Sequence, residues 1–128
     1  MTEKKIAPRS DIDKILSYID AHLARIQSVS AIASLMGYSV SHFHRIFREA
    51  TGYTPSEYVQ ERRIARAKAL LEASDLTVTE IAASVGMRDV GYLSRLFRTH
   101  TGKTPTEYRA SVKSRAAFAN VRAKPEGG

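Results

Sequence analysis

The chain has 128 residues, of which 20 are Lys or Arg and 13 are Asp or Glu, giving a net charge of +7. Hydrophobic residues make up 43% and charged residues 26%, which is typical of a globular protein and too apolar for a fully disordered one. The absence of cysteine excludes disulfides, cysteine-ligated zinc and a thiol nucleophile. The positive surplus favours a polyanionic partner, with nucleic acid ahead of a membrane surface.

No apolar run approaches the ~18 residues of a membrane-spanning helix. Residues 1–10 also lack the apolar stretch of a secretory signal peptide. We therefore expect no membrane partner and a cytoplasmic location.

Apolar residues recur at helical rather than strand spacing, and the sequence predicts an all-α fold. Ser10 is the predicted cap of the first helix. Capping boxes mark three further helix starts, and glycines that follow apolar runs mark four helix ends. The boxes are Thr54–Glu57, Thr77–Glu80 and Thr104–Glu107, and the glycines are Gly37, Gly52, Gly86 and Gly102. The seven predicted helices span residues 11–26, 29–36, 40–51, 55–74, 78–85, 90–101 and 105–115.

An internal repeat relates residues 29–58 to residues 78–108. Ile32 and Ile81 are 49 residues apart, whereas Phe47 and Phe97 are 50 apart, so the second copy has one extra residue in its turn. Each copy contains a short helix, a glycine turn and a second helix, which is the helix-turn-helix pattern.

The repeat predicts five segments. Helix-turn-helix subdomains at 10–53 and 76–115 are joined by a linker helix at 54–75, a rod of ~30 Å that is close to one turn of duplex DNA. Residues 1–9 and 116–128 are predicted to be disordered tails, the second one basic. Arg62, Arg63, Arg66 and Lys68 lie along the linker helix, where contact with phosphates and pairing with Glu61 or Glu72 are both open.

The second helix of each repeat carries two stripes at the same spacing. One stripe is apolar and predicts the core, and the neighbouring stripe is polar. Arginine is suited to bidentate contact with guanine, and serine and histidine can bond several base edges. The polar stripes are Ser41, His44, Arg45 and Arg48 in the first copy and Gly91, Ser94, Arg95 and Arg98 in the second.

Phosphate contacts are expected where side chains lie near helix ends. Arg48 and Arg98 lie toward the C-terminal ends of the two polar stripes. Ser39, Thr104 and Thr106 stand at helix starts, where hydroxyls and backbone N–H groups can bind phosphate, although capping is the simpler role for these hydroxyls.

Several motifs together resemble the DNA-binding domain of AraC/XylS-type transcription regulators. They run from Ile32-Ala33 through Gly37-Tyr38-Ser39 and Gly52-Tyr53-Thr54-Pro55 to Gly102-Lys103-Thr104-Pro105, and the resemblance covers roughly residues 10–112. Little of the chain lies outside them, so the chain resembles the single-domain MarA/SoxS-like subgroup.

The resemblance implies a monomeric bacterial activator, associated with the nucleoid, that binds asymmetric promoter DNA and contacts RNA polymerase. No cofactor is implied. By position, it implies that the residues reading bases are Ser41, His44 and Arg45 in the first module and Val90, Gly91, Ser94 and Arg95 in the second.

The sequence departs from the MarA-like pattern at four positions. Ser41 replaces a large aromatic residue, Val90 and Gly91 replace amides, and Met87 replaces a phenylalanine expected in the core. The target sequence of MarA-like proteins is therefore not transferred to this chain, and we expect a second module that contributes mostly phosphate contacts together with Arg95.

Three other interpretations remain. An enzyme is disfavoured because no phosphate loop, carboxylate pair or nucleophile motif is present, and His42 and His44 would point to different sides of a helix. A basic helical module for protein or membrane interaction is the second alternative, based on the segment Arg109–Lys124. The third is a DNA-binding fragment of a larger effector-responsive regulator.

Overall fold

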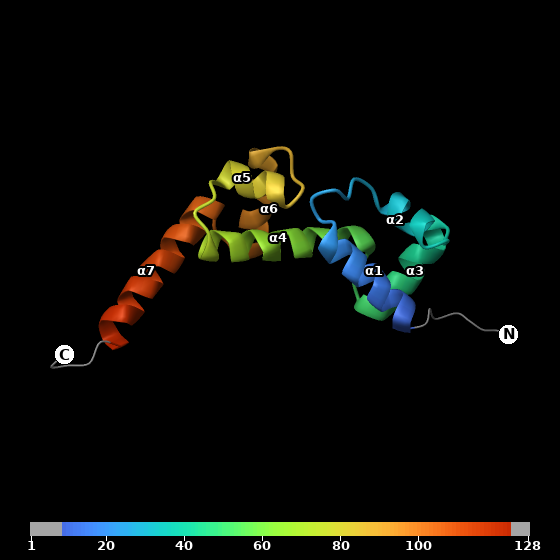
Figure 1. Cartoon of the computed structure of the whole chain (residues 1–128), viewed down its shortest axis with the longest axis horizontal. Coiled ribbons are helices and arrows are strands. Elements are labelled where there is room, and N and C mark those ends of the chain that lie inside the picture. Colours follow the sequence, from blue (N-terminus) through green and yellow to red (C-terminus); the bar gives the residue numbers. More distant parts are fainter. Residues whose placement is uncertain (1–8, 124–128) are drawn as a thin grey trace. The chain divides into compact units, whose positions relative to one another are not determined.

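The structure of the protein is a computed structural model, which describes residues 9–123 and the side chains of residues 11–116. Figure 1 shows that the described part of the chain folds into helices without a strand. The all-α prediction is therefore confirmed. The helices are α1 (Arg9–Ala21), α2 (Val29–Leu35), α3 (Val40–Thr51), α4 (Pro55–Ala73), α5 (Val78–Ser84), α6 (Val90–Thr101) and α7 (Pro105–Ala123).

The chain forms two compact units, and the boundary between them falls between Arg63 and Ile64. The boundary lies inside α4, so this helix contributes its first half to the N-terminal unit and its second half to the C-terminal unit. Each unit contains one copy of the sequence repeat, α2 with α3 or α5 with α6.

The core of the N-terminal unit is built around α3. Phe43 and Phe47 are fully buried there, one helical turn apart, with ring centroids 5.8 Å apart. Burying a large side chain of this kind contributes about 1.5–3 kcal/mol to folding. The same cluster includes apolar residues from α1, the turn after it, α2 and α4, namely Ile12, Ile15, Ile19, Leu23, Ile32, Ala33 and Val59.

The C-terminal unit has an equivalent core around α6. Leu93 and Phe97 are fully buried at the positions that correspond to Phe43 and Phe47. Met87 is buried in this cluster, as the sequence predicted. The remaining members come from α4 and α5 and the residue after α5, namely Ile64, Ala67, Leu71, Ile81, Ala82 and Val85.

The predicted helix signals are confirmed at seven positions. In all three capping boxes the threonine hydroxyl accepts from the glutamate N–H and the glutamate carboxylate accepts from the threonine N–H. The four predicted glycines all have positive φ, between 79° and 88°, a backbone conformation that side chains disfavour. Gly52 and Gly102 cap α3 and α6, while Gly37 and Gly86 form the turns of the two helix-turn-helix motifs.

The predicted bounds of the first helix are wrong at both ends. The helix starts at Arg9, so Ser10 lies inside it rather than capping it, and Asp11 occupies the first turn, where a negative charge is favourable. The helix ends at Ala21 and a turn follows. Apolar periodicity overestimated its length because Leu23 and Ile26 pack on the same core from that turn.

The last helix also differs from the prediction. It continues to Ala123 rather than ending at residue 115, so the tail predicted to be disordered from residue 116 begins as helix. Residues 116–123 contain four alanines and no glycine or proline, a composition with high helix propensity that needs no apolar stripe. Residues 1–8 and 124–128, also assigned to tails, lie outside the described residues.

Candidate nucleic-acid interface

Helix α3 separates its core face from a polar face, as the sequence predicted. Phe43, Ile46 and Phe47 are buried. Ser41, Arg45 and Arg48 are exposed, and His44 between them is half-buried. The side chains of the polar stripe therefore lie at the surface of the N-terminal unit, where a duplex can reach them.

The start of α3 is fixed by Ser39. Its hydroxyl accepts a hydrogen bond of 3.1 Å from the N–H of His42 and caps the helix. Leu35 and Val40 flank the turn, with 65% and 45% of their surface exposed. Their exposure is consistent with an apolar contact such as a thymine methyl group.

Arg45 has a partner that the sequence reasoning did not identify. Its Nη2 lies 3.0 Å from Nδ1 of His42, one helical turn earlier. His42 is half-buried, and its ring packs at 5.2 Å against the ring of Tyr38 in the turn. The three-residue spacing on one helix was the available signal for this pair.

Helix α6 has the corresponding arrangement in the C-terminal unit. Leu93 and Phe97 are buried, Arg95 and Arg98 are exposed, and Ser94 is half-buried. Val90 and Gly91 are half-buried at the start of the helix. Tyr92, which the sequence reasoning passed over, is 42% exposed.

Asp89 caps α6, and the sequence reasoning also missed this residue. Its Oδ1 accepts a hydrogen bond of 2.8 Å from the N–H of Gly91. A Cβ at position 91 would lie 3.2 Å from that oxygen and 3.4 Å from Nη1 of Arg95. Because Gly91 has no side chain, there is open space at this position. The Asp89 carboxylate and the Arg95 guanidinium both lie next to that space.

Comparison with known protein families identifies this arrangement. A family model described as a helix-turn-helix domain matches residues 32–111, more than half of the chain. The chain belongs to the AraC/XylS-type helix-turn-helix family. The family and fold are those of DNA-binding transcription regulators rather than enzymes.

Curated relatives agree with this family assignment. The AraC/XylS-type chain is 36% identical over 78 residues to the HTH-type transcriptional activator RhaS of Escherichia fergusonii, a match that covers 61% of the chain and 28% of RhaS. It is 34% identical over 77 residues to the probable transcription factor PqrA of Proteus vulgaris, covering 59% of the chain and 63% of PqrA. The chain thus spans less than a third of RhaS and under two thirds of PqrA.

Solved structures share the fold. The DNA-binding domain of the global transcriptional factor AdpA, crystallised with a target DNA, matches with a TM-score of 0.79 and 31% identity, over 82% of this chain and 95% of that domain. An AraC-type transcriptional regulator from Chromobacterium violaceum matches with a TM-score of 0.74 and 27% identity, over 92% and 96% of the two chains.

The hydroxyls predicted to contact phosphate are placed differently in this AraC/XylS-type chain. Thr104 sits in a capping box beside the Glu107 carboxylate, whereas Thr106 is exposed on the first turn of α7. Hydrogen bonds from Thr104, with smaller effects of the positive charges of Arg98 and Lys103, lower the pKa of Glu107. Glu107 is therefore a negative charge that competes with phosphate near Thr104 and Arg98.

Two of the arginines predicted along the linker helix, Arg62 and Arg63, have partners within the protein. Arg62 donates from Nε to Asp20 on α1 at 2.8 Å, and this hydrogen bond raises the pKa of Arg62. Arg63 donates to the carbonyl oxygens of Leu23 and Ile26 at 2.9 and 2.7 Å. Both side chains thus attach α4 to the end of α1 and the turn after it.

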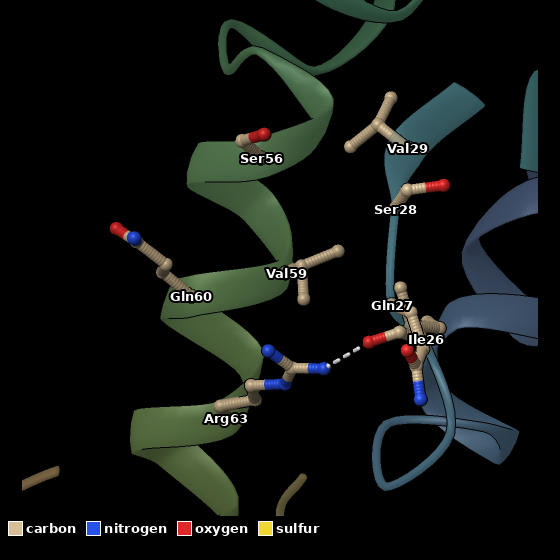
Figure 2. A pocket seen from close by; sticks show the side chains of 8 residues that line it. All are labelled: Ile26, Gln27, Ser28, Val29, Ser56, Val59, Gln60 and Arg63. Carbon is tan, nitrogen blue, oxygen red and sulfur yellow. Dashed lines mark hydrogen bonds between the residues drawn. The ribbon is translucent and has the colours of Figure 1, made fainter. Parts of the chain in front are cut away.

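A small pocket lies between α4 and the segment before α2 in the N-terminal unit. Figure 2 shows Arg63 reaching across it to the chain at Ile26. Its volume is about 150 Å³, and it is lined by Ile26, Gln27, Ser28, Val29, Ser56, Val59, Gln60 and Arg63. None of these residues belongs to α3, so the pocket is separate from the polar stripe.

Among the described residues, no group of three or more histidine or acidic side chains could hold a metal ion. In the same part of the chain, no helix is long and apolar enough to span a bilayer.

Proposed function

We propose that this chain binds double-stranded promoter DNA sequence-specifically, with α3 and α6 as reading helices in successive major grooves. The observation that carries the proposal is the exposed polar stripe on α3, anchored by a buried apolar face and repeated on α6. The net charge of +7 and the DNA complex of the AdpA domain support duplex DNA as the ligand.

Base reading is assigned to the middle and start of each reading helix. In α3 these residues are Ser41, His44 and Arg45, and in α6 they are Val90, Gly91, Ser94 and Arg95. Phosphate contacts are assigned to Ser39, Arg48, Arg98, Thr104 and Thr106. Thr104 is the weakest of these candidates, because its hydroxyl already accepts from Glu107 and the Glu107 carboxylate repels phosphate.

We assign the chain an activating role as a monomer in contact with RNA polymerase, in the manner of the single-domain MarA/SoxS-like subgroup. Two modules in one chain supply the bivalency that most helix-turn-helix proteins obtain by dimerisation. The relative RhaS is named as an activator. Such a protein would work in the bacterial cytoplasm, associated with the nucleoid.

A second candidate keeps the same DNA-binding role within a larger regulator. The match covers 28% of RhaS, so this chain is similar to one part of a longer activator. The two candidates differ in whether this chain alone activates a promoter.

The test combines site selection with transcription. Purified protein is offered a pool of random duplexes, and the selected motif is compared with sites mapped across the source genome. We expect one asymmetric motif whose two halves are about one helical turn apart. The motif should disappear when Arg45 and Arg95 are both replaced by alanine. Equal binding to all duplexes, or to anionic vesicles as strongly as to DNA, would contradict the proposal.

In vitro transcription from the selected site separates the two candidates. If this chain alone raises transcription by RNA polymerase, it acts as a complete activator. Specific binding without activation favours the role as the DNA-binding part of a larger regulator.

A further inference from the structure

We propose that His42 is a positioning residue for Arg45 and thereby sets which base pair the N-terminal unit discriminates. The inference rests on the proposed DNA-binding function. It concerns the hydrogen bond of 3.0 Å between Arg45 Nη2 and His42 Nδ1 on the exposed side of α3.

The chemistry of the two groups fixes the direction of this hydrogen bond. A guanidinium has five N–H donors and no acceptor, and it keeps its charge in proteins. Nδ1 of His42 must therefore be the acceptor, which places the ring proton of neutral His42 on Nε2. In this form the imidazole holds one edge of the guanidinium and leaves its other N–H groups available for a base.

His42 can hold Arg45 because His42 is itself held. Its backbone N–H donates to the capping hydroxyl of Ser39, and its ring packs against Tyr38 with an angle of 55° between the planes. The hydroxyl of Tyr38 donates to Asp11 on α1 at 2.8 Å. A continuous set of contacts thus runs from α1 through the turn to the exposed arginine.

Orienting the Arg45 side chain before DNA binds affects both affinity and specificity. A long exposed side chain loses rotamer freedom when it binds, and this loss is smaller if the bound direction is already favoured. A bidentate contact with guanine also depends on the orientation of the guanidinium plane. His42 therefore affects the base pair read by Arg45 without touching the DNA itself.

The C-terminal unit lacks this arrangement. The residue 50 positions after His42 is Tyr92, and Met87 stands at the position of Tyr38. Arg95 instead lies beside Gly91 and near the Asp89 carboxylate. Only the N-terminal unit is therefore expected to depend on the residue one turn before its arginine.

Two substitutions at position 42 separate the hydrogen bond from the packing. His42→Phe keeps a ring against Tyr38 and removes the acceptor, whereas His42→Asn restores an acceptor close to the position of Nδ1. We expect His42→Phe to weaken binding to the selected site about 3- to 10-fold, the effect of one net hydrogen bond. Binding to unrelated duplexes should change less than about twofold, since phosphate contacts are unaffected. His42→Asn should regain most of the loss.

The decisive readout is the selected motif. His42→Phe should relax the same base pair as Arg45→Ala, and it should add no further loss in an Arg45→Ala background. His22→Phe is the matched control, because His22 also stacks on a tyrosine, with ring centroids 4.1 Å apart, but belongs to the turn after α1 rather than to α3. It should leave the motif unchanged.

Two results would overturn the proposal. Losses from His42→Phe and Arg45→Ala that multiply in the double variant would show that the residues act independently. Relaxation at a different base pair would show that His42 reads DNA directly.

A measurement without DNA keeps this inference distinct from the proposed function. In the free protein, nitrogen-15 shifts of the His42 ring should report the form protonated on Nε2, and Arg45→Ala should change the Nδ1 shift. The form protonated on Nδ1 would overturn the positioning role even if the parent protein selects a motif. If the parent protein selects no motif, the proposed function fails and base reading through Arg45 fails with it.

Discussion

The hydroxyl of Tyr38 donates a hydrogen bond of 2.8 Å to Oδ2 of Asp11. Tyr38 follows the turn glycine of the first helix-turn-helix motif, and Asp11 lies in the first turn of α1, 27 residues earlier. The bond therefore joins the start of the N-terminal unit to the loop that leads into α3.

Replacing Tyr38 with phenylalanine removes this bond and keeps the ring. We expect the free energy of unfolding to fall by about 0.5–1.5 kcal/mol, the net value of a partly buried hydrogen bond. Urea unfolding at neutral pH measures this loss. Tyr53→Phe, at an exposed tyrosine, serves as the control and should have little effect.

The same variant gives a pH-dependent prediction. Burial, and then the hydrogen bond and charge of Asp11, raise the pKa of Tyr38 above 10.0. Neutral Tyr38 therefore stabilises the fold fully below that pH, and its contribution is lost as the pH rises through the raised value. The stability difference between the parent and Tyr38→Phe should shrink above about pH 10. A difference that grows with pH would contradict the assignment.

The two cores predict separate effects of two equivalent substitutions. Phe47 and Phe97 are each fully buried, in different units and at matching positions of the repeat. Either change to alanine should cost about 3–5 kcal/mol. Hydrogen exchange should show the lost protection in α1–α3 for Phe47→Ala and in α5–α7 for Phe97→Ala. Equal loss across both units for each variant would argue against two separate cores.

Arginines on the reading helices should divide into two classes. Arg45→Ala or Arg95→Ala is expected to cost about 1–3 kcal/mol on the selected site and to relax one base pair each. Arg48→Ala should weaken specific and non-specific binding alike, because a phosphate contact does not distinguish bases. Site selection with each variant beside the parent provides the measurement. An unaltered motif in both Arg45→Ala and Arg95→Ala would show that neither residue reads bases.

Binding should depend strongly on salt. With about 6–10 phosphates neutralised, the logarithm of the binding constant should fall against the logarithm of salt concentration with a slope of roughly −5 to −9. Titrations at several salt concentrations, with the stoichiometry measured by sedimentation, check the slope and the monomeric state. A slope near zero, or a requirement for a dimer, would refute this prediction.

The continuity of α4 gives a test of bivalent binding. Ala67 is fully buried in the C-terminal core, so a flexible insertion there would damage that core. Two glycines inserted between Arg63 and Ile64 fall at the boundary of the units instead. Specific affinity should fall much more than the stability of either unit, through lost effective concentration. Unchanged specific affinity would show that an unbroken α4 is not needed for binding.

The sequence by itself determined the helical fold, the repeat and the two faces of α3 and α6. These follow from local rules: apolar residues at helical spacing, capping boxes that pair residues three apart, and glycines that supply a positive φ. Phe43 and Phe47 were placed in the core and Arg45 and Arg48 at the surface because α3 has one regular period throughout.

Only the tertiary structure decided features that depend on contacts across the chain. It ended α1 at Ala21, because Leu23 and Ile26 can reach the core from a turn while Arg63 binds their carbonyl oxygens. It also paired Arg62 with Asp20 across 42 residues, a partner that spacing along one helix does not reveal.

The structure also determined how Arg45 and Arg95 are surrounded. Arg45 and Arg95 stand at matching positions of the repeat, so the repeat alone assigns both of them to the same helix face. Arg45 bonds to His42, which packs against Tyr38, and Tyr38 in turn bonds to Asp11 on α1. Arg95 and the Asp89 carboxylate instead border the space left by Gly91. The difference arises because side-chain direction depends on the neighbours that the fold assembles, and periodicity along a helix specifies only the face.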